Sequence, residues 1–160
     1  MRLIYGSNNR IEVRNLKELT IGESFNGFFN SLKEKNNLEN MTDQELYNYI
    51  FEDFLGDIVA YLSPYTLDRL ENEGIIDEDI YSLAKNIRNE LFEMINGPLW
   101  NVNSVKISKE WSKIFEDLKK LDILVRKKWT EEEIEYLKTI QKMHSITRRN
   151  REDRALTSQQ

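Results

Sequence analysis

Apolar side chains recur every three to four residues over most of this chain, which is the spacing of amphipathic helices. The N-terminal residues differ, because apolar and polar residues alternate there around a run of turn formers at 6–9. This alternation predicts a small N-terminal β-hairpin in a mainly α fold of the α+β class. The helical spacing predicts five to six helices, which begin after Ser24, Thr42, Ser63, Asp77, Ser108 and Thr130.

Capping residues mark several of these helix starts. Thr42 with Glu45, and Thr130 with Glu133, have the spacing of capping boxes, in which each side chain accepts a hydrogen bond from the other residue's backbone N–H. Between 100 and 107 the apolar period is irregular, and this stretch allows a short strand beside the hairpin.

The helix predicted over 43–62 has a very broad apolar face, so we expect it to be the central helix against which the others pack. On a helical wheel its apolar arc contains Tyr47, Ile50, Phe51, Phe54, Leu55, Ile58, Val59 and Leu62. The opposite arc contains Glu45, Glu52, Asp53 and Asp57, and Tyr49 falls among these acids.

Composition narrows the classes of function. The 160 residues include no cysteine and one histidine, His144, which leaves little material for a catalytic triad or a thiolate or multi-histidine metal site. The six glycines are scattered and form no phosphate-binding loop. We therefore expect a protein that is not an enzyme and needs no cofactor.

The organisation of the chain is simple. We expect one globular domain over 1–145, followed by a polar basic tail over 146–160 that is frayed or disordered. Residues 1–6 lack the apolar h-region of a signal peptide, and no apolar run approaches the length of a membrane span. The expectation is a cytoplasmic protein without membrane contact.

The net charge of −5 hides a strong asymmetry along the chain. Residues 38–98 contain 14 acids and three bases and carry −11, whereas 1–37 carry +2 and 99–160 carry +4. Such a layout creates a surface potential that attracts an oppositely charged partner. The sequence therefore favours a basic protein as the partner and leaves the oligomeric state open.

The acidic arc of the 43–62 helix is the candidate partner-binding site. A tyrosine ringed by carboxylates has the composition of a binding hot spot with a polar rim, and the residues in question are Glu45, Tyr49, Glu52, Asp53 and Asp57. Two alternatives stay open: the arc is a solvated helix face with Tyr49 half covered by a loop, or Asp53 and Asp57 bind a divalent cation in a metal-dependent enzyme.

About 30 residues around Trp111 resemble the C-terminal part of some small acidic immunity proteins of bacterial toxin systems. The residues that carry this resemblance are Lys109, Glu110, Trp111, Ile114, Phe115 and Leu118. The resemblance implies a helical, non-enzymatic protein that masks a cognate toxin, often a basic nuclease. It carries over no functional residue.

Two further interpretations compete with an immunity protein. A phage-encoded inhibitor of a host defence nuclease fits the same charge layout. Nucleic-acid binding is the third, because phosphates attract a basic C-terminal flank made of Arg126, Lys127, Lys128, Lys142, Arg148, Arg149, Arg151 and Arg154.

Overall fold

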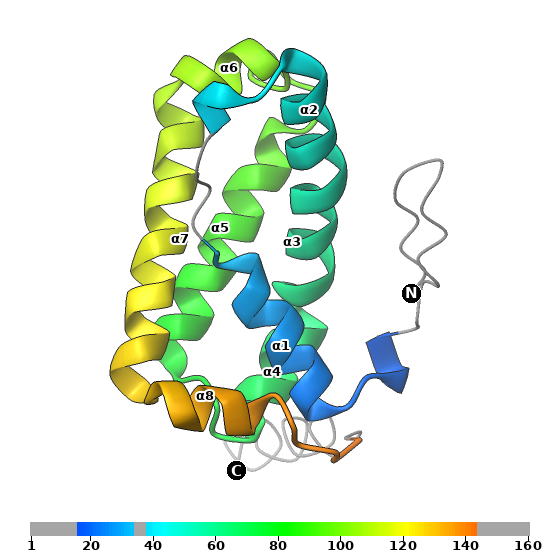
Figure 1. Cartoon of the computed structure of the whole chain (residues 1–160), viewed down its shortest axis with the longest axis vertical. Helices are drawn as coiled ribbons and strands as arrows, with labels where there is room; N and C mark the ends of the chain where they lie inside the picture. Colours follow the sequence, from blue (N-terminus) through cyan, green and yellow to red (C-terminus); the bar gives the residue numbers. More distant parts are fainter. Residues whose placement is uncertain (1–15, 34–37, 144–160) are drawn as a thin grey trace, which may run out of the picture.

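The computed structural model describes residues 16–33 and 38–143, and the described residues form a bundle of helices without a strand (Figure 1). This confirms the mainly α class, whereas the predicted hairpin, His144 and the tail lie outside the described residues. The elements are η1 (Leu16–Glu18), α1 (Ile21–Ser31), η2 (Leu38–Asn40), α2 (Asp43–Tyr47), η3 (Asn48–Phe54), α3 (Leu55–Tyr61), α4 (Pro64–Asn72), α5 (Glu78–Met94), α6 (Val102–Ile107), α7 (Lys109–Lys128) and α8 (Glu131–Leu137).

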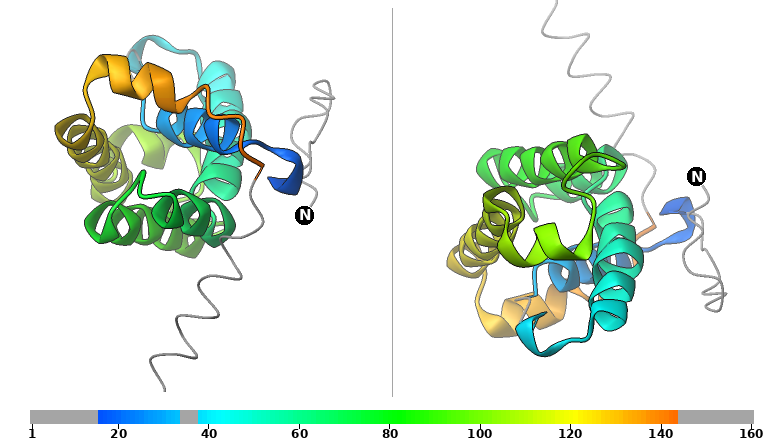
Figure 2. Two further views of the ribbon diagram at one scale, coloured as in Figure 1. Left: turned by 90° about the horizontal axis from the view of Figure 1, so that it is seen from below. Right: turned by 90° about the horizontal axis from the view of Figure 1, so that it is seen from above.

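Three long helical segments run side by side along the bundle: α5, α7 and the continuous helix made of α2, η3 and α3 (Figure 1). Helix α1 crosses in front of them, α6 lies beside α2 at one end, and α4 and α8 lie at the other end. Seen along the bundle, the helix over 43–61 forms one wall and not the centre (Figure 2). The expectation of a central helix is therefore wrong, because several helices share the core between them.

One apolar cluster holds the bundle together, and its largest fully buried side chains include Trp111, Phe25, Phe28 and Phe54. The indole Nε1 of Trp111 donates to the carbonyl of Leu99 at 2.8 Å, so the polar atom of this side chain is satisfied inside the core. Full burial of such side chains contributes roughly 1.5–3 kcal/mol each.

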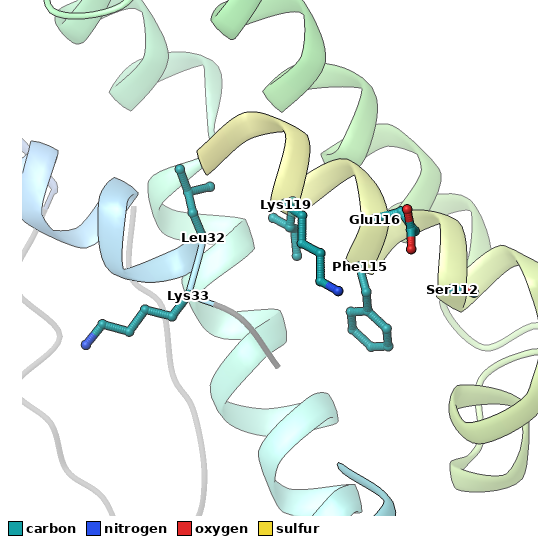
Figure 3. A pocket seen from close by; sticks show the side chains of 7 residues that line it. Leu32, Lys33, Ser112, Phe115, Glu116 and Lys119 are labelled. Atoms are coloured by element: carbon teal, nitrogen blue, oxygen red, sulfur yellow. The ribbon is translucent and has the colours of Figure 1, made fainter. Parts of the chain in front are cut away.

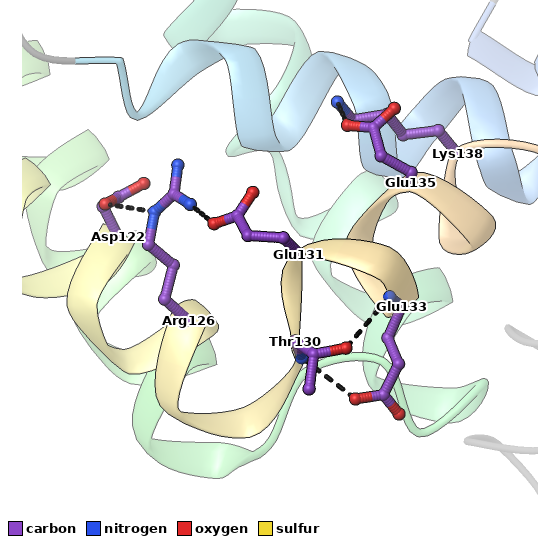
Figure 4. Close-up of polar contacts among 7 residues, drawn as sticks. All are labelled: Asp122, Arg126, Thr130, Glu131, Glu133, Glu135 and Lys138. Atoms are coloured by element: carbon purple, nitrogen blue, oxygen red, sulfur yellow. Dashed lines mark hydrogen bonds and ion pairs between the residues drawn. The ribbon is translucent and has the colours of Figure 1, made fainter.

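The predicted caps are present. Thr42 pairs with Glu45 and Thr130 pairs with Glu133 in complete capping boxes, the second of which is visible in Figure 4. The side chains of Ser63, Asp77 and Ser108 also accept a backbone N–H at the start of their helices, as expected.

Two local predictions were wrong. Helix α1 begins after Thr20, which forms a capping box with Glu23, and Ser24 is buried inside the first turn. Residues 102–107 form α6 and not a strand, because Asn101 caps them by accepting the Ser104 N–H at 2.8 Å. In both places the N-cap residue, Thr20 or Asn101, defines the start of the helix, whereas the spacing of apolar residues there is irregular.

Candidate protein-binding site

A π-helical turn, η3, interrupts the helix that carries the predicted site. The N–H of Leu55 reaches back to the carbonyl of Ile50, five residues earlier, in place of the α-helical partner four residues earlier. Such a turn accommodates about one extra residue, which rotates the preceding segment by roughly 100° relative to the following one. π-Helical turns within α-helices occur frequently at functional sites.

The rotation changes which side chains of α2 enter the core. Leu46, absent from the predicted apolar arc, is fully buried, whereas Tyr47, which was predicted on that arc, is 48% exposed. Leu55 and Val59 are half-buried, and the predicted burial of Ile50, Phe51, Phe54, Ile58 and Leu62 is confirmed. A wheel with a constant 100° step places Tyr47 in the core because it omits the extra residue.

The same turn aligns the predicted acidic residues. In an ideal α-helix Glu45, Tyr49, Asp53 and Asp57 would spread over roughly 120°, because each step of four residues overshoots a turn by about 40°. The wider π turn removes most of this drift, so helix geometry places the four residues close to one line along the helix. We call this line the acidic column.

Tyr49 is the half-buried member of the acidic column and packs against the apolar core. Burial raises its pKa, and the negative charges of Asp57 and Asp53 raise the pKa further. Both carboxylates therefore act on the phenol while their own side chains remain exposed to solvent. The structure brings these three residues together, as the sequence predicted.

The other two predicted residues have different surroundings. Glu45 is exposed, but its Oε2 accepts the N–H of Thr42 at 3.1 Å, so this carboxylate also maintains the start of α2. Glu52 is half-buried, and its position in the sequence, one residue before Asp53, puts it outside the four-residue spacing of the acidic column. The charge of the column near Tyr49 thus rests on Asp53 and Asp57.

A cluster of aromatic rings next to α2 was not predicted. The ring of Tyr47 lies 5.2 Å from that of Phe51, and Phe51 lies 4.7 Å from Trp100 and 5.9 Å from Trp111. The sequence contains no signal for it, since Trp100 precedes α6 and reaches Phe51 through tertiary packing alone.

The alternative of a metal-dependent enzyme gains no support. Within residues 16–33 and 38–143, no three His, Asp or Glu residues come together in an arrangement that could bind a metal ion, so Asp53 and Asp57 have no third ligand there.

A cavity of about 210 Å³ lies between the end of α1 and α7, as shown in Figure 3. Its lining mixes apolar and charged side chains: Leu32, Lys33, Ser112, Phe115, Glu116, Leu118 and Lys119.

A second group of charged residues joins α5 to α7. Asp117, 5% exposed, lies 2.8 Å from Lys113 and 3.6 Å from Lys120, and Lys113 also reaches Glu90 at 2.7 Å. Hydrogen bonds to Asp117 and Glu90 raise the pKa of Lys113. These ion pairs compensate the charge of the buried Asp117 carboxylate, and the pair between Lys113 and Glu90 links α7 to α5. Their role is therefore structural.

Two of the four described residues of the basic flank are in ion pairs. Arg126 contacts Asp122 and Glu131, as Figure 4 shows, and Lys142 lies 3.0 Å from Glu73. Three consecutive glutamates begin α8 directly after this flank. Phosphate groups would have to displace these carboxylates, which weakens the nucleic-acid interpretation.

No helix in the described part of the chain combines the length and the apolar character of a membrane span. Comparison of the chain with protein-family models, with curated proteins and with solved structures found no match.

Proposed function

We propose that this chain is a stoichiometric protein-binding inhibitor that masks a basic partner, as an immunity protein masks its cognate toxin. The observation that supports the proposal is the acidic column, in which the half-buried Tyr49 is accompanied by the exposed carboxylates of Asp53 and Asp57. The ring supplies area to bury, and the carboxylates steer a basic protein toward it. Occlusion of the partner's active site or nucleic-acid groove would then inhibit it.

A phage-encoded inhibitor of a host defence nuclease would use the same surface, so the identity of the partner separates the two. Capture on the immobilised full chain from a lysate of the source organism, followed by mass spectrometry, supplies that identity. A recovered nuclease should lose its activity at a molar ratio of one to one.

The role of the acidic column is tested by reversing its charge. The double variant Asp53→Lys with Asp57→Lys leaves the Thr42–Glu45 capping box intact. Its matched control is Glu93→Lys with Glu116→Lys, since both glutamates are exposed and lie on other helices. At low salt, association of the purified partner should slow about tenfold or more for the column variant, and change little for the control.

Equal association rates for the two variants would remove the acidic column from the proposal. The nucleic-acid alternative has its own test, which is a gel shift with the full chain at roughly 50 mM salt, where electrostatic binding to phosphates is strong. A shift that disappears on deletion of 146–160 would favour it over the inhibitor.

A further inference from the structure

Two large apolar side chains are exposed at the same end of the bundle. Tyr47 on α2 is 48% exposed and Ile107 on α6 is 73% exposed, and the two helices pack against each other there (Figure 1). Lys106, the neighbour of Ile107, bonds to Asp43 of α2 at 2.7 Å. The half-buried Trp100, which precedes α6, belongs to the same end. We call Tyr47, Trp100 and Ile107 the end patch.

The end patch rests on a rigid support. The ring of Tyr47 packs at a tilt against that of Phe51, and Phe51 in turn contacts Trp100 and the fully buried Trp111. Trp100 also lies 5.7 Å from Trp111. Because these rings are held by the core, little conformational entropy remains to be lost when a partner covers them, which is the condition for an energetically important contact.

The end patch and the acidic column flank the same exposed helix face. The π turn places Tyr47 at the edge next to α6 and the column at the opposite edge, and a helix with its side chains is about 10–12 Å wide. A stable interface covers roughly 800 Å² on each partner, which extends well beyond that width. A protein that docks on the column can therefore also reach Tyr47.

We propose that the end patch is a docking site for a lysine- or arginine-rich segment of a protein partner that also carries apolar side chains. The inference rests on the proposed function, because the basic character of the segment follows from charge complementarity with the acidic column. The apolar side chains of the segment cover Tyr47 and Ile107, while its cations face Asp53 and Asp57. Tyr47 thereby serves as a second anchor, at the opposite edge of the helix face from Tyr49.

The test uses two helical peptides with identical lysines, one with leucines and the other with serines on the remaining face. Binding to the full chain is followed by tryptophan fluorescence, since Trp100 belongs to the patch and Trp111 lies 5.7 Å from it. The leucine peptide should bind about tenfold more tightly, a difference of about 1.4 kcal/mol. In the variant Tyr47→Ser with Ile107→Ser, the two peptides should bind equally.

The matched control is Ile123→Ser with Tyr136→Ser, which removes two exposed apolar side chains from α7 and α8. This control should retain the tenfold preference. A preference that survives in the Tyr47 and Ile107 variant, or a leucine peptide that binds no better than the serine peptide to the unmodified chain, overturns the inference. Thermal melting confirms that each variant is folded.

The peptide experiments distinguish a wrong assignment of the end patch from a wrong proposed function. If the serine peptide binds in a salt-dependent manner and loses affinity with Asp53→Lys and Asp57→Lys, the acidic column is supported even when the end patch is not. If neither peptide responds to those two changes, the column itself is refuted. Sedimentation that shows self-association abolished by Tyr47→Ser with Ile107→Ser would replace the basic segment by a second copy of the chain.

Discussion

Nη2 of Arg69 donates to the carbonyl of Leu19 at 2.8 Å, although 50 residues separate them. The same guanidinium donates through Nη1 to Ser24 Oγ at 2.9 Å and to the carbonyl of Leu16 at 3.3 Å. Arg69 is 2% exposed, and its burial lowers its pKa. One buried cation therefore joins η1, α1 and α4 through neutral acceptors.

Arg69→Met should destabilise the chain by on the order of 3 kcal/mol, because it leaves several buried acceptors without donors. Arg69→Lys should recover little of this loss, since one ammonium cannot reproduce the fork of the guanidinium. Arg88→Met is the control, because Arg88 lies over the ring of Phe92 at 4.3 Å and is half-buried. Urea unfolding measures the free energy of unfolding of these three variants. Equal decreases for Arg69→Met and Arg88→Met would contradict the prediction.

Gly22 lies where α1 meets the segment after α8. Its N–H donates to the carbonyl of Ile140 at 2.9 Å, and a Cβ here would lie 2.4 Å from the carbonyl oxygen of Lys138. Gly22→Ala should therefore destabilise by about 1–3 kcal/mol, despite the higher helix propensity of alanine.

Gly27→Ala provides the comparison for Gly22→Ala. The added Cβ meets the ring of Tyr61 at 2.2 Å, and a half-buried ring can rotate away, unlike a backbone carbonyl. In thermal melting, the Gly22→Ala variant should have a lower melting temperature than the Gly27→Ala variant. The opposite ranking would show that the contact between α1 and the segment after α8 is loose.

Local chemistry explains how much of this fold was predictable. The Thr42–Glu45 and Thr130–Glu133 boxes depend on residues three positions apart, so the sequence alone locates the helices that they begin. The contacts of Arg69 with Leu19, and of Trp129 Nε1 with the Ile75 carbonyl, join residues 50 or more positions apart. No local pattern encodes such long-range hydrogen bonds.

The candidate site was predictable in composition but not in arrangement. Tyr49, Asp53 and Asp57 are four residues apart, and that spacing alone suggests a shared helix face. The exchange of Leu46 and Tyr47 between core and surface depends on the π turn. A helical wheel that assumes 3.6 residues per turn throughout a helix cannot predict where such a turn occurs. Trp100 joins this region only because α6 packs on α2.

The raised pKa of Tyr49 predicts a change in stability at alkaline pH. The unfolded tyrosine titrates near 10.0, whereas burial, Asp57 and Asp53 raise the pKa in the folded chain. Between these two values the unfolded state binds fewer protons than the folded state, so stability falls as pH rises. The contribution is fully present below pH 10 and is lost as pH rises through the folded pKa.

Tyr49→Phe removes this titration. From pH 8 to about pH 11, the variant should lose less unfolding free energy than the unmodified chain, as measured by urea titration followed by circular dichroism. Tyr136→Phe is the control, because the Tyr136 side chain is 68% exposed. Parallel losses of unfolding free energy in Tyr49→Phe and the unmodified chain would show that neither burial nor the carboxylates of Asp57 and Asp53 raise the pKa of Tyr49.

The π turn itself can be removed by deletion of Asn48. A regular α-helix then replaces the turn, and Leu46 keeps its place in the core. Tyr49, Asp53 and Asp57 then spread over roughly 80°, because each of the two steps of four residues overshoots a turn by about 40°. The free energy of unfolding should fall by no more than about 1 kcal/mol, and an increase is equally compatible with the prediction. The reason is that the side chain of Asn48 is exposed and accepts a single hydrogen bond, from Gln44 Nε2. Association with a basic partner should slow, because Asp53 and Asp57 no longer line up with Tyr49.

Asn48→Ala is the matched control for that deletion, because it removes the same side chain and keeps the length of the turn. It should preserve both stability and association rate. If the deletion instead costs several kcal/mol in urea unfolding, the π turn is required by the packing of α2 and α3 against the core. If the deletion is neutral in stability and Asn48→Ala and the deletion associate equally fast, the alignment of the column has no role in binding.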